Sequence, residues 1–107
     1  MNITTGVNVN GSCLQGYLDG VSFWELIDIF GEPTDQGSAD GKTRVGWSIR
    51  FEEEFDNYTV SIYDWKTDED LTEIRRWNVG GYDKMGYATL LTYVCAQLKE
   101  VRNEIAG

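Results

Sequence analysis

The stretch TRVGWSIRFEEEFDNYTVSIYDW, residues 43–65, decides the fold. In its first strand, 43–51, apolar residues alternate with small or polar ones, which is the period of a half-buried strand. The apolar positions are Val45, Trp47, Ile49 and Phe51. A second strand, 58–65, follows an acidic turn. The stretch therefore predicts a β-hairpin around which the other elements pack.

A short helix, 23–30, is predicted before the hairpin. Ser22 and Glu25 have the spacing of a capping box at its start, and Gly31 suits the position after its end. Its expected buried stripe is Phe23, Ile27 and Phe30, with Trp24 beside it. The first 20 residues, rich in Gly, Asn and Thr, predict an extended or edge segment of low regularity.

A third strand, 71–79, and a long helix, 83–104, are predicted after the hairpin, with Asp83 as the N-cap of the helix. The apolar stripe of this helix is Tyr87, Leu91, Val94, Leu98, Val101 and Ile105. The expected fold is one α+β domain over residues 1–107. In it a three-stranded antiparallel sheet, hairpin 43–65 plus strand 71–79, is covered by the helices in two layers.

Composition narrows the classes of function. The chain has 107 residues, 41% of them hydrophobic, and a formal charge of −9, which disfavours binding to nucleic acid or to anionic membranes. The N-terminus has no secretion signal and no apolar run is long enough to span a membrane, so we expect a cytoplasmic protein. Cys13 and Cys95 are then expected to be reduced and buried.

The sequence indicates no enzyme, cofactor or metal. It contains no histidine, which is the commonest general base and metal ligand. It also lacks a nucleophile elbow, a Walker loop and a dinucleotide fingerprint. Carboxylate chemistry stays open as an alternative, with Asp64 on a strand between aromatic residues as its candidate.

Acidic residues are concentrated in one part of the chain. Residues 52–73 hold nine of the 18 acids and a single base, Lys66. The candidate protein-binding residues are Glu52, Glu53, Glu54, Asp56, Asp68, Glu69 and Asp70. They form either an ordinary solvated surface or a decoy that mimics nucleic acid and binds the basic, nucleic-acid-binding surface of a host protein.

A second candidate site is centred on Gly80-Gly81, where paired glycines before a helix can leave free N–H groups that suit a phosphate. Its residues would be Trp65, Lys66, Arg75, Arg76, Trp77, Gly80, Gly81, Tyr82 and Lys84. The ligand would be a nucleotide-like small molecule stacked on an aromatic ring. Asp83 argues against this site, because a capping carboxylate would occupy the position that an anion needs.

Four motifs resemble those of a group of small bacteriophage proteins: FGEPT (30–34), WSIRF (47–51), SIYDWK (61–66) and WNVGG (77–81). The resemblance covers roughly residues 21–90 and implies a viral origin, but it supplies no catalytic or binding residue. The expected function is a phage-type inhibitor that binds a bacterial host protein, such as a defence component, in the cytoplasm of the infected host. The alternative is sequestration of a nucleotide-like signal. The apolar seam of the long helix can also pair with a second copy.

Overall fold

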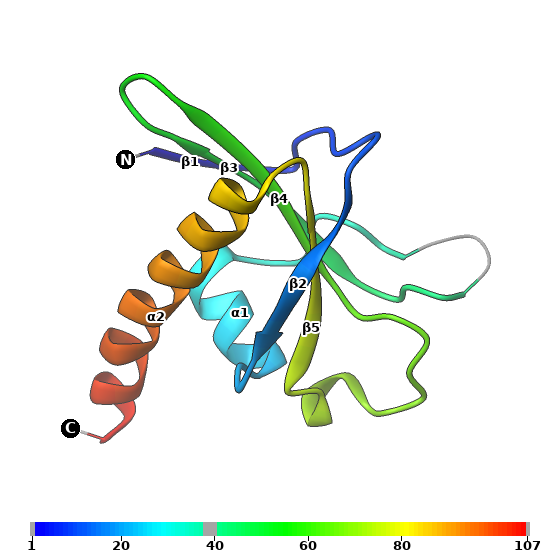
Figure 1. Ribbon diagram of the computed structural model, residues 1–107. Coiled ribbons are helices and arrows are strands. Elements are labelled where there is room, and N and C mark those ends of the chain that lie inside the picture. Colours follow the sequence, from blue (N-terminus) through cyan, green and yellow to red (C-terminus); the bar gives the residue numbers. More distant parts are fainter. Residues whose placement is uncertain (1, 38–40, 107) are drawn as a thin grey trace.

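The computed structural model describes residues 2–37 and 41–106. Its elements, in chain order, are β1 (Asn2–Thr5), β2 (Cys13–Asp19), α1 (Phe23–Phe30), β3 (Gly46–Glu52), β4 (Asn57–Tyr63), the 3-10 turn η1 (Leu71–Glu73), β5 (Arg76–Gly81) and α2 (Lys84–Ala106). The strands form one antiparallel sheet in the order β1-β3-β4-β5-β2. Both helices cover the same face of this sheet, so the molecule has two layers (Figure 1).

The sheet has five strands, and the predicted count of three is wrong because the first 20 residues supply both edges. β1 pairs with β3, and β2 pairs with β5, where Cys13 lies opposite Gly81. Partners so distant in the chain leave no local signal in the sequence. β1 also has only four residues, and a register shift between Leu14 and Gly16 interrupts the alternation in β2.

The open end of the predicted hairpin is shorter than expected. β3 starts at Gly46 and β4 ends at Tyr63. Beyond these residues Asp64 Oδ1 accepts hydrogen bonds from the backbone N–H groups of Arg44 (2.8 Å) and Val45 (3.0 Å). A carboxylate thus takes the place of cross-strand carbonyl partners, and beyond it one backbone hydrogen bond, from the N–H of Lys66 to the carbonyl of Lys42 at 2.8 Å, still joins the two segments.

The predicted strand 71–79 is wrong at both ends. Its first residues form the 3-10 turn η1, and β5 begins only at Arg76. Ile74 does not follow the alternation of the strand, because this residue lies before the start of β5. Gly80 and Gly81 belong to β5, where they pair with β4 and β2, and so they do not end the strand.

The predicted helix 23–30 is confirmed as α1, together with its capping box. Ser22 Oγ accepts from the N–H of Glu25 at 3.2 Å, and Glu25 Oε1 accepts from the N–H of Ser22 at 3.0 Å. Phe30 is buried and Phe23 and Ile27 pack against the core, as expected. Leu26 is fully buried, whereas Trp24 is 60% exposed.

The long helix is confirmed as α2, and Asp83 caps it by accepting from the N–H of Gly86 at 2.8 Å. Of the predicted stripe, Val94 is buried and Tyr87 and Leu98 pack against the core, but Leu91 is exposed. The best-covered positions are Gly86, Leu90 and Val94. The side chain of Ile105 lies outside the described residues. The expectation that both cysteines are buried is wrong, since Cys13 and Cys95 are exposed.

Two buried tryptophans attach α1 to the sheet. Trp47 on β3 and Trp77 on β5 meet edge to face, with their ring centroids 5.6 Å apart. The indole N–H of Trp77 donates to the carbonyl of Val21, just before α1, at 2.8 Å. That of Trp47 donates to the carbonyl of Gly31, just after α1, at 2.9 Å. The two rings therefore fix both ends of the helix while they fill the core.

The other face of the sheet carries the connection between its two edges. Because β1 and β2 lie at opposite edges, residues 6–12 must cross this face. Small residues lie side by side beneath, since Ser61 on β4 pairs with Ser48 on β3 and with Gly80 on β5. A Cβ at Gly80 would lie 2.6 Å from Ser61 Oγ and 3.7 Å from Ser12 Oγ. Close approach of neighbouring atoms therefore accounts for the glycine.

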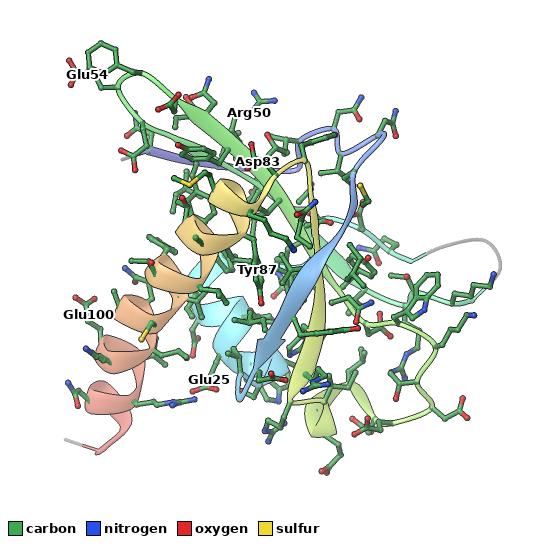
Figure 2. The ribbon with its side chains drawn as sticks, viewed as in Figure 1. Glu25, Arg50, Glu54, Asp83, Tyr87 and Glu100 are labelled. Atoms are coloured by element: carbon green, nitrogen blue, oxygen red, sulfur yellow. The ribbon has the colours of Figure 1, made fainter. Side chains whose placement is uncertain are left out.

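The free edge of β2 is closed by side chains of α2. Tyr87 Oη accepts from the N–H of Tyr17 at 3.1 Å and donates to its carbonyl at 2.6 Å, and Lys84 Nζ donates to the carbonyl of Gln15. Figure 2 shows Tyr87 reaching from α2 toward the sheet. An unpaired strand edge invites association with another chain, so these contacts protect β2.

Candidate functional site

The acidic hairpin tip, defined here as residues 52–57, projects beyond the rest of the sheet (Figure 1). The turn is closed by a hydrogen bond from the N–H of Glu53 to the carbonyl of Asp56 at 2.8 Å. Phe55 is 89% exposed at this turn. Four carboxylates surround it in the sequence, at Glu52, Glu53, Glu54 and Asp56. An aromatic ring that is left in water among charges adds nothing to the core.

The start of α2 extends the negative field of the tip. Burial, and then the charges of Asp56, Asp83 and Glu53, raise the pKa of Tyr58. Asp83 therefore acts on the same phenol as two residues of the tip, and Figure 2 shows it at the start of α2. Sequence reasoning did not connect Asp83 with the tip, because the packing of α2 on β4 brings them together.

Two open hollows flank the tip. One, of about 470 Å³, is polar and lies among Asn2, Asn57 and the three glutamates of the tip. The other, of about 420 Å³, lies between the tip and the outer side of α2. We call the second hollow the α2 groove; it is lined by Glu53, Ala88, Thr89, Thr92, Tyr93 and Ala96. Glu53 is thus shared by both hollows.

Comparisons with known proteins find no relative: no family model, curated protein or solved structure matches the chain. Within residues 2–37 and 41–106, no group of three or more Cys, Asp or Glu side chains is placed to hold a metal ion. Over the same residues, no helix is both long and apolar enough to cross a membrane.

The second acidic cluster does not join the tip. Asp68, Glu69 and Asp70 follow the far end of β4, in the loop before η1. Asp70 Oδ1 accepts from the N–H and the hydroxyl of Thr72 at 3.0 and 2.7 Å, and the backbone hydrogen bond is the main cause that lowers the pKa of Asp70. Asp70 therefore orders its own loop.

The residues of the predicted phosphate site are separated by the length of β5. Trp65, Lys66, Arg75 and Arg76 lie near its start, whereas Gly80, Gly81, Tyr82 and Lys84 lie at its end. Trp77 lies between these groups and is fully buried. The paired glycines do not open α2, because Asp83 caps that helix. Several of the other side chains have structural partners: Arg75 with the carbonyls of Thr72 and Ile74, Arg76 with Asp19, Tyr82 with the carbonyl of Asn10, and Lys84 with that of Gln15.

A different hollow lies near the first of these groups. It has a volume of about 340 Å³ and is bounded by the crossing connection, the segment before β3 and the end of β4. Trp65, 45% exposed, forms one wall. The ammonium groups of Lys42 and Lys66 lie 6.0 and 5.5 Å from the centre of its ring. An aromatic wall beside two cations is the combination that an aromatic anion needs.

Asp64, the candidate for carboxylate chemistry, is enclosed. Only 2% of the residue is exposed, and Arg44 Nε donates to its Oδ2 at 2.8 Å. Its Oδ1 accepts the two backbone hydrogen bonds from Arg44 and Val45. These contacts hold the ends of β3 and β4 together and leave the carboxylate directed at its own chain.

Proposed function

We propose that this protein is a non-catalytic inhibitor that binds a basic surface of a bacterial protein through the acidic hairpin tip. The observation that carries the proposal is Phe55, a fully presented aromatic ring within a turn of carboxylates. Aromatic anchors contribute much of the energy of protein interfaces, and surrounding charges choose the partner and speed association. The net charge of −9 favours a cationic partner.

The resemblance to bacteriophage proteins supports a partner in the infected host, such as a component of a defence system, and therefore action in the host cytoplasm. The enclosure of Asp64 supports inhibition by contact over carboxylate catalysis. Both acidic clusters have an exposed aromatic ring nearby, but Phe55 lies within the tip at 89% exposure, whereas Trp65, beside the second cluster, is 45% exposed and has Lys42 and Lys66 over its ring. We therefore assign the binding role to the tip and leave Asp68, Glu69 and Asp70 with the loop before η1.

Charge reversal at the tip tests the proposal. We expect Glu53→Lys with Glu54→Lys to weaken binding to a host protein captured from a bacterial lysate at least tenfold, and Phe55→Ala to do so by about thirtyfold, as expected for an interface anchor. The matched control is Asp68→Lys with Glu69→Lys, which changes net charge equally. Affinity capture with mass spectrometry identifies the partner, and calorimetry with that purified partner measures the affinity.

Equal weakening by both charge reversals would show that bulk charge, and not the tip, drives binding. Full binding by the Phe55→Ala variant would remove the anchor from the proposal. Circular dichroism should show all these variants folded, because the substituted side chains are exposed.

Sequestration of a nucleotide-like molecule is the second candidate function, and the hollow beside Trp65 favours it at a new position. If this candidate holds, native mass spectrometry of protein purified from a bacterial host should show a bound phosphorylated compound. The Trp65→Ala variant should then lose the compound, and Trp24→Ala, a change at another exposed tryptophan, should keep it. An unliganded wild-type protein would count against this candidate.

A further inference from the structure

The α2 groove has a floor of small residues. Ala88, Thr92 and Ala96 recur at a spacing of four along α2, so they lie on one side of the helix. The neighbouring Tyr93 turns its ring inward, with its centroid 5.4 Å from that of Phe51 and 5.8 Å from that of Phe30. Because the large side chain is used in the core, the outer side of α2 is left as a shallow apolar trough.

The groove is negative at both ends. Glu53 of the hairpin tip forms a wall beside Ala88, and Asp83 lies before the first turn of α2. Glu100 follows Ala96 by four residues, which is one helical turn, and Figure 2 shows it on α2. Burial, and then the charge of Glu100, raise the pKa of Tyr93, so Glu100 acts on the groove wall. Lys99 lies in a neighbouring hollow of α2.

These dimensions and charges define an occupant. From Ala88 to Glu100 the helix rises about 18 Å, which is the length of about three helical turns. We infer that the α2 groove receives a basic amphipathic helix of the partner protein, with aliphatic side chains on the small residues of the floor and lysine or arginine facing Glu53 and Glu100. This inference rests on the proposed function, because it names the class of surface that the acidic hairpin tip meets.

A second copy of this chain is a poorer occupant. It would bring its own Glu53 and Glu100 against those of the first copy, and like charges across an interface oppose association. Of the apolar seam predicted from the sequence, Val94 is buried and Tyr87 and Leu98 pack against the core of the same chain, although Leu91 is exposed. Charge complementarity therefore selects a cationic partner helix.

Selection from a displayed library of random peptides, each about four helical turns long, tests the inference with the purified wild-type chain as bait. We expect enriched peptides with aliphatic residues at a spacing of three or four and with flanking lysine or arginine. Thr92→Arg, which fills the groove with a cation, should weaken their binding at least tenfold. The control, Leu14→Arg, places the same side chain at an exposed position of β2 outside the groove and should leave binding unchanged.

The outcomes separate this inference from the proposed function. If the peptides tolerate Thr92→Arg but lose binding to Glu53→Lys with Glu54→Lys, the groove inference fails and the tip stands. Peptides that tolerate both changes would overturn both. Failure to enrich any cationic peptide, or a dimer of the wild-type chain in light scattering that Thr92→Arg dissolves, would also overturn the partner helix.

Discussion

The Trp77→Ala variant is expected to lose about 4 kcal/mol of its free energy of unfolding. The indole is fully buried, so its removal leaves a cavity beside Trp47. The carbonyl of Val21 also loses its hydrogen-bond donor. A domain of this size has about 5–15 kcal/mol in total, so the loss is a large fraction. Guanidinium denaturation followed by far-UV circular dichroism measures it without depending on tryptophan fluorescence.

Two further variants separate the causes of this loss. Trp77→Phe keeps much of the volume and removes the hydrogen bond to Val21, so it should cost about half as much as alanine. Trp24→Ala removes the same side chain from a surface position that is 60% exposed and should cost less than about 1 kcal/mol. If Trp24→Ala were as destabilising as Trp77→Ala, the central role given to the buried pair would be wrong.

The sequence predicts those parts of the fold whose determinants are close together in the chain. The capping box at Ser22 and Glu25 specifies the start of α1, and the alternation around Trp47 specifies β3. The extended or edge segment predicted over the first 20 residues forms the two edge strands β1 and β2. The sequence does not predict their pairing, because their partners are distant and because Gly16, over which the Tyr87 ring packs, weakens the pattern of β2. The predicted hairpin is thus the centre of a larger sheet.

The sequence likewise predicts only part of the candidate site. The carboxylates around Phe55 are visible in the sequence, because they are neighbours in the chain. The α2 groove cannot be seen in the sequence, because it depends on the direction in which the Tyr93 side chain turns and on the approach of α2 to Glu53. The glycines at 80 and 81 predict a helix start, whereas in the structure Gly80 lies in β5 where a Cβ would come within 2.6 Å of Ser61 Oγ. A glycine pair does not by itself distinguish these causes.

Asp64→Asn should also lower the free energy of unfolding, by about 2–3 kcal/mol. This loss is smaller than that expected for breaking a fully buried ion pair, because Arg44 is partly exposed. An asparagine oxygen can still accept from the N–H groups of Arg44 and Val45, but its NH₂ group would then face the guanidinium of Arg44, donor against donor. Denaturant unfolding measures the loss, with the exposed Asp68→Asn as the control, expected within about 0.5 kcal/mol of wild type.

The same variant decides between a structural and a chemical role for Asp64. If the carboxylate only joins the ends of β3 and β4, Asp64→Asn should unfold at lower denaturant yet, below its transition, bind the host partner as tightly as wild type. The binding surface at Phe55 lies at the other end of β4, beyond the reach of this ion pair. A variant as stable as wild type that had lost its biological effect would place Asp64 in the chemistry of the protein and would refute inhibition by contact alone.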